Sequence, residues 1–147
     1  DDWLWGGSID EIYTTITHGI RNDQDDDARF SEMPAFGDML EPEQIREVSA
    51  YVISLSGTPS NEALVEPGKV VFEENCVACH GENAQGDKDF GAPDLADAIW
   101  LYDGTEAGVA SQVRNPQHGV MPAWGSRLGD TTVKQLAVFV HSLGGGQ

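Results

Sequence analysis

Two cysteines and a histidine stand in one short run, Cys76-Val77-Ala78-Cys79-His80. This C-x-x-C-H spacing is typical of covalent haem attachment, in which the two thiols add to the porphyrin vinyl groups as thioethers. A helical turn at that spacing then directs the adjacent imidazole toward the iron. The sequence therefore predicts one c-type haem, with Cys76 and Cys79 as attachment sites and His80 as an iron ligand.

Two other uses of this motif compete with haem attachment. A redox-active dithiol would need a surrounding βαβ pattern, which the sequence lacks. A zinc site would need a second pair of thiolate or imidazole ligands at suitable spacing, and the chain has only 2 cysteines. Haem attachment is therefore the favoured interpretation of the motif.

A sixth iron ligand is expected from a loop downstream of the motif, and Met121 fits that position. It precedes Pro122, which biases it toward an extended conformation, and it lies in a loop and not on a helix face. A neutral thioether favours Fe(II) and raises the reduction potential. With both axial positions filled, the iron would transfer electrons and would not bind oxygen. His118 is the competing ligand.

The chain contains two copies of one sequence pattern. The run Met33-Pro34-Ala35-Phe36-Gly37 matches Met121-Pro122-Ala123-Trp124-Gly125 at an offset of 88 residues (121 − 33). The run Trp3-Leu4-Trp5 matches Trp100-Leu101-Tyr102 at an offset of 97 (100 − 3). The first copy therefore has 9 extra residues (97 − 88), and the acidic stretch at 23–27 is the natural place for this insertion. Repetition of this kind indicates two related domains.

Each copy ends in a pattern typical of an amphipathic helix. Apolar residues recur at helical spacing over 45–55 in the first copy and over 133–143 in the second. A further helix is predicted to begin near Pro67 and to run through Phe72 to the first cysteine. Residues 92–124 show no long periodicity, so a haem is expected to fill the centre of this small domain.

The chain is strongly acidic, with 25 Asp and Glu against 8 Lys and Arg and a net charge of −17. Such a surface repels phosphate, so nucleic acid is excluded as a partner and a basic protein surface is favoured. Adaptation to a salty environment would give the same composition. No apolar run approaches the roughly 20 residues of a membrane-spanning helix. Membrane attachment is therefore expected only through a missing N-terminal anchor.

The whole chain resembles the periplasmic portion of the dihaem subunit III of cbb-type haem-copper cytochrome c oxidases, the CcoP or FixP family. The resemblance rests on the two repeated runs above, on Phe90-Gly91-Ala92-Pro93-Asp94-Leu95 and on the closing Val140-His141-Ser142-Leu143-Gly144-Gly145-Gly146. It implies an all-α fold, in which a class I cytochrome c domain follows a truncated second cytochrome c-like domain.

The resemblance also implies roles for individual residues. Pro93 matches the proline whose carbonyl accepts a hydrogen bond from the proximal imidazole, here His80, and that bond tunes the iron. In the family, the N-terminal and C-terminal helices cross at a glycine and aromatic residues. The expected crossing places Gly68 and Phe72 against Leu136 and Phe139. The expected haem propionate partners are Trp100, Tyr102 and Arg114.

The first copy departs from the family because it has no C-x-x-C-H motif of its own. It keeps Met33, the expected ligand of a first haem if that haem is present. We expect residues 1–57 to be a truncated haem domain, 58–66 a linker and 67–147 the cytochrome c domain. The chain is either a fragment or a family member that has lost its first haem, and the retained methionine loop favours a fragment.

This truncation has consequences for packing and for cofactor content. Some 57 residues without a haem would not bury enough apolar surface to fold alone. We therefore expect residues 1–57 to pack on the second domain, on a missing N-terminal piece or on a neighbouring copy. One covalent haem c per chain is expected, and a second only if the missing N-terminal part is supplied.

The resemblance implies electron transfer on the periplasmic side of the bacterial inner membrane. The expected partners are a donor cytochrome c and the catalytic and monohaem subunits of the oxidase. Oxygen reduction would occur in the catalytic subunit, with no catalytic site in this chain. A freely diffusing periplasmic cytochrome c that serves another reductase is the alternative. A haem enzyme or ligand sensor is a third possibility, which would require an open or displaceable sixth position.

Overall fold

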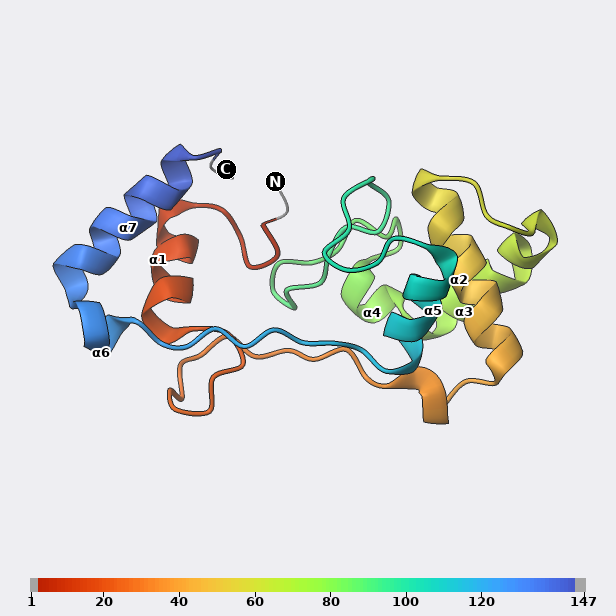
Figure 1. Ribbon diagram of the computed structural model, residues 1–147, viewed down its shortest axis with the longest axis horizontal. Coiled ribbons are helices and arrows are strands. Elements are labelled where there is room, and N and C mark those ends of the chain that lie inside the picture. The colour runs from red at the N-terminus through yellow and green to blue at the C-terminus, as the bar shows by residue number, and fades with distance from the viewer. Residues whose placement is uncertain (1–2, 145–147) are drawn as a thin grey trace. The chain divides into compact units, whose positions relative to one another are not determined.

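A computed structural model describes residues 3–144 (Figure 1). Its α-helices are α1 (Ile9–His18), α2 (Pro42–Ser56), α3 (Val65–Asn75), α4 (Val77–His80), α5 (Glu106–Arg114), α6 (Gly125–Leu128) and α7 (Asp130–Ser142). Two short 3-10 helices are η1 (Phe36–Asp38) and η2 (Glu62–Leu64). Isolated β-bridges occur, but no strand is present within 3–144. The predicted all-α class is confirmed. Gly145 and Gly146 of the closing motif lie outside the described residues.

The chain divides into two compact units. Unit 1 consists of Asp1–Glu32, Lys88–Gly91 and His118–Gln147, and unit 2 consists of Met33–Asp87 and Ala92–Gln117. Each unit therefore combines segments of both sequence copies, and neither coincides with the expected ranges 1–57 and 67–147. The two helices of the first copy pack on helices of the second copy: α1 contacts α7, and α2 contacts α3 and α5. Such packing is expected for a stretch too short to fold alone.

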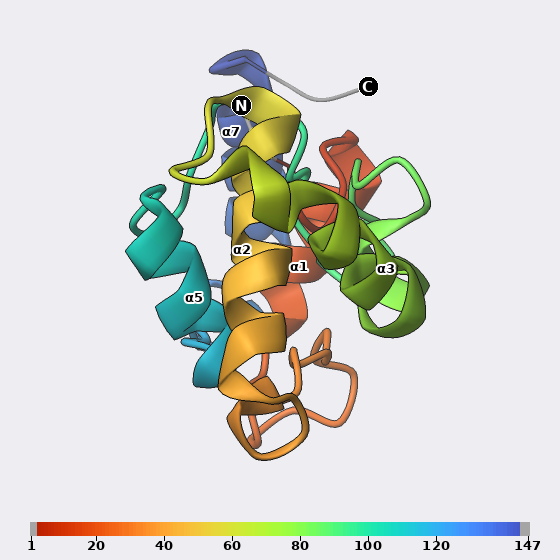
Figure 2. The same ribbon diagram turned by 90° about the vertical axis from the view of Figure 1, so that its right-hand side faces the viewer.

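Unit 2 is organised around α2, the amphipathic helix that ends the first copy. Pro42 occupies the first turn, and Glu41 and Gln44 form a reciprocal capping box that satisfies free backbone N–H groups. The apolar stripe Ile45, Val48 and Val52 is buried. In Figure 2, α2 lies between α3 and α5, and it packs on both helices. Burial of this stripe stabilises the core of the unit.

The crossing of α2 and α3 depends on Gly68. A Cβ atom at this position would lie 2.0 Å from the carbonyl oxygen of Glu47, so only glycine lets the two backbones approach this closely. The rings of Tyr51 and Phe72 pack beside the crossing, with their centroids 5.3 Å apart.

The predicted contact of α3 with Leu136 and Phe139 is therefore wrong. Tyr51 is the repeat equivalent of Phe139 at the offset of 88, and it takes the expected place, while Phe139 is 58% exposed. The two terminal helices carry the same apolar pattern, so the pattern did not distinguish which of them packs on α3.

Helix α5 was not predicted, since residues 92–124 showed no long periodicity. It has only 9 residues, and two of them, Val109 and Val113, are buried. Thr105 caps its first turn by accepting a hydrogen bond from the Gly108 N–H. A helix this short buries one residue per turn and gives a weak periodic signal.

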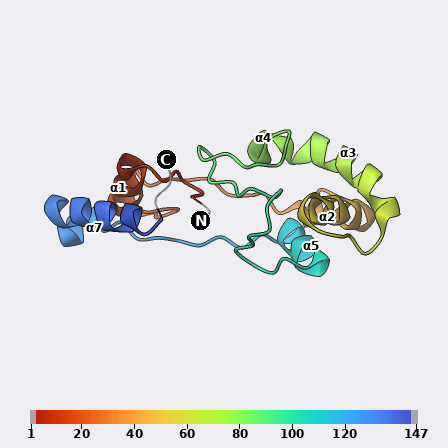
Figure 3. The same ribbon diagram turned by 90° about the horizontal axis from the view of Figure 1, so that it is seen from above.

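Unit 1 is built on α1 and α7, which lie side by side in Figures 1 and 3. A capping box between Ser8 and Glu11 starts α1, and the helix ends at His18, before Gly19 at φ 81°. Its buried residues Ile12 and Ile16 form one cluster with Val133 and Ala137 of α7.

Helices α1 and α5 occupy equivalent places in the two units. Gly37 lies against Arg114 at the end of α5, and its repeat equivalent Gly125 lies against Thr17 near the end of α1. In unit 1, α1 of the first copy packs on α7, the terminal helix of the second copy. In unit 2, α5 of the second copy packs on α2, the terminal helix of the first copy. No helix within residues 3–144 is long and apolar enough to cross a membrane.

Candidate haem site

The C-x-x-C-H motif forms a short helical turn that directly follows α3. Cys76 ends α3 and precedes α4, and its carbonyl accepts hydrogen bonds from the N–H groups of Cys79 (3.2 Å) and His80 (3.0 Å). Figure 3 shows α3 leading into α4. Residues three apart on a helical turn share one face, so the two thiols are placed to bind one planar group.

The imidazole of His80 is oriented by a backbone carbonyl. Its Nδ1 lies 3.2 Å from the carbonyl oxygen of Pro93. A carbonyl only accepts hydrogen bonds, so Nδ1 carries the proton and donates it, which leaves Nε2 with a free lone pair. Burial lowers the pKa of His80, partly opposed by this bond, and favours the neutral imidazole that iron requires. The hydrogen bond expected between these residues is present.

The loop after His80 brings Pro93 to the ring. Gly86 adopts φ 76°, and a Cβ there would lie 2.3 Å from the carbonyl oxygen of Ala92. The Gly86 N–H donates to the His80 carbonyl (2.9 Å), and Asp87 and Ala92 exchange two backbone hydrogen bonds. Glycine at 86 thus permits the close approach of two backbone segments that holds the proline carbonyl beside the histidine.

The buried thiol of Cys76 is unsuited to redox chemistry on its own. Burial, with the neighbouring Cys79, raises the pKa of Cys76 to about 11. A redox-active dithiol needs a thiol whose pKa is lowered, because the thiolate is the reactive species. Both cysteines are free. Free thiols on one helical turn beside an imidazole with an available Nε2 fit the attachment and ligation of a haem.

Unit 2 contains most of the predicted site residues. Trp100 packs against the main apolar cluster and against Gly104, where a Cβ would lie 2.5 Å from the indole. Tyr102 is 47% exposed, and Arg114 is exposed at the end of α5.

The two methionine loops fall in different units. Met33 packs against the same apolar cluster as Cys76 and Val77 of the attachment turn, in unit 2. Met121 packs against the apolar cluster shared by α1 and α7 in unit 1, which also contains His118. The packing therefore brings Met33 into the unit of His80. Equivalence of the two loops was visible in the sequence, but their assignment to different units was not.

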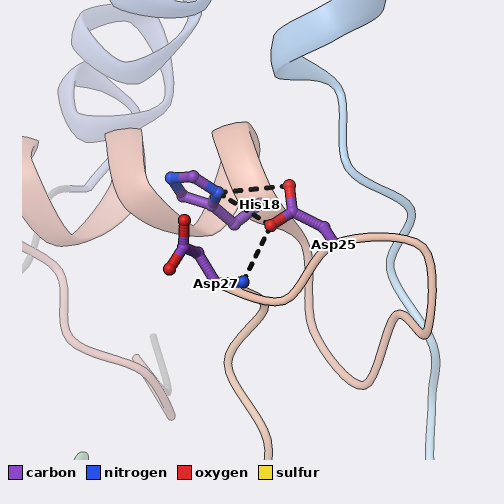
Figure 4. Close-up of side chains that lie close together, drawn as sticks. All are labelled: His18, Asp25 and Asp27. Carbon is purple, nitrogen blue, oxygen red and sulfur yellow. Dashed lines mark hydrogen bonds and ion pairs between the residues drawn. The ribbon is translucent and has the colours of Figure 1, made fainter.

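A second cluster of polar side chains lies at the end of α1 (Figure 4). His18 Nδ1 lies 3.1 and 3.2 Å from the two carboxylate oxygens of Asp25, and the Asp27 N–H donates to Asp25 Oδ1 at 2.9 Å. Ligand atoms of all three residues lie within 4.8 Å of one another. The hydrogen bonds account for this arrangement, which closes the acidic loop on the helix.

Sequence reasoning also missed a pair of arginines in unit 1. The guanidinium carbons of Arg21 and Arg29 lie 6.0 and 5.8 Å from the ring centroid of Trp5, which is buried. Trp5 was singled out by the repeat, but the arginines belong to none of the repeated runs. No sequence signal therefore linked them to the tryptophan.

The class of c-type cytochrome domains is defined by a helical unit with a C-x-x-C-H turn, a histidine oriented by a proline carbonyl and a methionine loop. Residues 63–140 match the family described as cytochrome c oxidase, cbb3-type, subunit III. The chain belongs to this family.

The chain is also similar to curated relatives over its whole length. It is 60% identical over 147 residues to the cbb3-type cytochrome c oxidase subunit FixP of Sinorhizobium medicae, covering 100% of this chain and 51% of the relative. The FixP subunit of Rhizobium meliloti gives the same identity and coverage. Identity to the CcoP subunit of Cereibacter sphaeroides is 52% over 149 residues, with the same coverage. The chain spans about half the length of these relatives.

Proposed function

We propose that this chain transfers electrons through one c-type haem bound covalently to Cys76 and Cys79, with His80 as the proximal iron ligand. The observation that carries the proposal is the bond from His80 Nδ1 to the Pro93 carbonyl, which leaves Nε2 available beside the two thiols. The haem would supply a one-electron redox couple. The protein would set its potential through the axial ligands, the hydrogen bond on His80 and burial.

The sixth ligand is proposed to be Met121. The order of the repeats supports this choice, since Met121 follows the attachment motif within the same sequence copy. Met33, which packs in the same apolar cluster as Cys76 and Val77, is the alternative. Either thioether would raise the reduction potential relative to a second imidazole and would close the iron to oxygen.

Trp100, Tyr102 and Arg114 remain candidates for the haem propionates. All three fall in the unit of His80, which supports the assignment. Trp100 offers an indole N–H from a packed position, whereas Tyr102 and Arg114 are exposed and offer a hydroxyl and a guanidinium.

We further propose that the chain is part of the electron-input subunit of a cbb3-type oxidase on the periplasmic side of the inner membrane. It would take electrons from a donor cytochrome c and pass them, with the monohaem subunit, to the catalytic subunit, where oxygen is reduced. The FixP and CcoP names of relatives that are 60% and 52% identical over the whole chain support this role. An anchor outside these residues would hold it to the membrane.

Residues 1–57 are proposed to be the later part of a first haem domain. This stretch keeps a methionine loop and a terminal helix but has no C-x-x-C-H motif. The relatives are about twice as long, which supports the proposal that the chain is a fragment. One covalent haem per chain follows, and a second would need a further segment.

The test is a redox titration of the chain produced with periplasmic cytochrome c maturation. The expected result is one reversible one-electron transition, reduction by an added c-type cytochrome, and no spectral change when carbon monoxide is added to the reduced protein. A carbon monoxide complex would contradict the closed site and favour the ligand sensor. Cys76→Ser with Cys79→Ser is the control and should abolish the transition.

A further inference from the structure

The loop 94–105 of unit 2, which leads into α5, exposes a group of large apolar side chains. Ile99 is 45% exposed, Leu101 57% and Tyr102 47%, so much of their apolar surface lies in water. Figure 1 shows this loop, coloured green to teal, just before α5. Single exposed apolar side chains are ordinary, but a contiguous group often marks a surface that binds another molecule.

The loop is fixed to the body of unit 2. Trp100 packs against the main apolar cluster, and Gly104 lets the chain pass close to the indole because a Cβ there would lie 2.5 Å from it. Leu95 packs against the same cluster, and its N–H donates to the Ala84 carbonyl at 2.7 Å. This packing holds the exposed side chains of the loop at the surface of the unit.

The same loop carries three carboxylates. Asp94, Asp97 and Asp103 each accept a hydrogen bond from the backbone N–H two residues further along the chain, at 2.7, 2.7 and 2.9 Å. None of these aspartates forms an ion pair within residues 3–144. The loop has no Lys or Arg, so it combines an exposed apolar group with three negative charges and no positive one.

The charge of the loop decides which partner it suits. A second copy of this chain has the same net charge of −17, and an anionic lipid surface is also negative, so both would be repelled. A basic protein face would be attracted. The exposed apolar group is small compared with the surface that a permanent subunit interface buries, which favours a partner that binds and leaves.

We propose that Ile99 and Leu101, with the carboxylates of Asp97 and Asp103, form the docking surface for the donor cytochrome c, which would present a lysine-rich face. This inference rests on the proposed function, because it locates the point at which the electron enters. Trp100, from the same loop, packs against the apolar cluster that also contacts Cys76 of the attachment turn. The loop therefore links the proposed docking surface to the core beside that turn.

The test is stopped-flow reduction of the oxidised chain, carrying its covalent haem, by a reduced, lysine-rich c-type cytochrome. Asp97→Asn/Asp103→Asn keeps the oxygens that accept from the backbone and removes the charges. Its rate constant should fall about fivefold at about 0.01 M salt and match the wild type at about 1 M, where charges are screened. Ile99→Ser/Leu101→Ser should be about fivefold slower at both, because it loses apolar contact. Tyr102 stays unchanged because it is a candidate propionate partner.

Two control variants match these changes elsewhere in unit 2. Asp38→Asn/Glu43→Gln removes the same charge from exposed residues near the other end of α5, where Gly37 packs on Arg114. Val70→Ser changes an apolar side chain of α3 that is 53% exposed. Both should stay within about twofold of the wild-type rate. Dithionite is small and needs no docking surface, so it should reduce every variant at the wild-type rate.

Several results would overturn the inference. Loop variants that react at the wild-type rate at low salt contradict it, and an equal loss in Asp38→Asn/Glu43→Gln would show only the general field of the chain. A loss that dithionite shares would place the defect at the haem. Wild-type dimers in sedimentation velocity that Ile99→Ser/Leu101→Ser abolishes would assign the loop to a second copy. A wild type reduced normally, with unaffected variants, contradicts the docking surface alone. A wild type that the donor does not reduce contradicts the proposed function as well.

Discussion

At the scale of single residues, His80 shows how a backbone group prepares a metal ligand. The Pro93 carbonyl, 3.2 Å from Nδ1, fixes both the tautomer and the direction of the ring before any metal is bound. Gly86 makes this possible because it lets the segment before Pro93 approach closely. The chemistry of the attachment motif was evident in the sequence, and the bond from His80 to Pro93 was expected from the family resemblance. The close backbone approach at Gly86 that holds this loop could be seen only in the structure.

The choice between Met33 and Met121 gives the first prediction. Met121→Leu should remove the weak absorption at the red end of the ferric spectrum that reports a methionine–iron bond, and it should lower the reduction potential, because the thioether is lost. Met33→Leu should leave both unchanged. Absorption spectroscopy and a redox titration of each variant provide the check. The opposite pattern would mean that the methionine loop of the first copy supplies the ligand.

Glu11 gives a prediction about pH. Its pKa of about 2 in the folded state lies below the ordinary value of 4.5, mainly because Lys88 and Ser8 donate hydrogen bonds to the carboxylate. Its contribution to stability is therefore fully present above pH 4.5 and is lost as the pH falls toward 2. Glu11→Gln, which keeps the capping hydrogen bonds, should lower the free energy of unfolding at pH 7 by about 1 kcal/mol or less.

The measurement is denaturant unfolding of Glu11→Gln and of the wild type across this pH range. The difference between their free energies of unfolding should narrow below pH 4.5. The exposed carboxylate of Glu32 supplies the matched control Glu32→Gln, for which a difference near zero is expected at every pH. A Glu11→Gln difference that stayed constant from pH 7 to pH 3 would contradict the role of the charge.

At the scale of helices, the two terminal helices are alternatives for one position. Helix α2 packs on α3 at the Gly68 crossing, where Tyr51 meets Phe72, and α7 packs on α1 with Phe139 largely exposed. The repeat makes Tyr51 and Phe139 equivalent by sequence. In the structure, however, Tyr51 is half-buried and Phe139 is exposed. This difference allows the arrangement to be tested by mutation.

Tyr51→Ala should lower the free energy of unfolding by roughly 2 to 3 kcal/mol, less than a fully buried aromatic because the side chain is only half-buried. Phe139→Ala should change it by no more than about 0.5 kcal/mol, as for most exposed positions. Denaturant titrations followed by circular dichroism would compare the two variants, each serving as the control for the other. A larger effect for Phe139→Ala would favour the helix pairing that the order of the sequence predicts.

The sequence predicted the elements of the fold better than their pairing. The helical periodicity over 45–55 and 133–143 became α2 and α7, and the helix expected near Pro67 begins two residues earlier as α3. Pairing was mispredicted because a periodic stripe specifies that a face is buried and not which of two equivalent surfaces covers it. Helix α5 was missed because 9 residues with two buried valines leave little periodic signal.

At the scale of the whole molecule, charge is the dominant feature. A net charge of −17 on 147 residues gives a negative field that attracts a basic partner before contact and speeds its encounter. The proposed transfer of electrons from a donor cytochrome c would benefit from such steering, since the two proteins would meet and separate repeatedly.

The rate of reduction by a basic c-type cytochrome should therefore fall by roughly tenfold as ionic strength rises from about 0.01 M to about 0.15 M, because the screening length shrinks from about 30 Å to about 8 Å. Stopped-flow absorption at several salt concentrations measures this rate. An acidic donor is the control, and its rate should rise with salt. A rate for the basic donor that is independent of salt would show that the acidity serves solvation and not docking.

The central claim is that one haem is attached covalently at Cys76 and Cys79. The most direct measurement is a pyridine haemochrome spectrum together with the intact mass of the same sample under denaturing conditions. The account predicts one covalent haem per chain, and its loss in Cys76→Ser/Cys79→Ser. A chain that carries no covalent haem after expression with the cytochrome c maturation system would contradict the account.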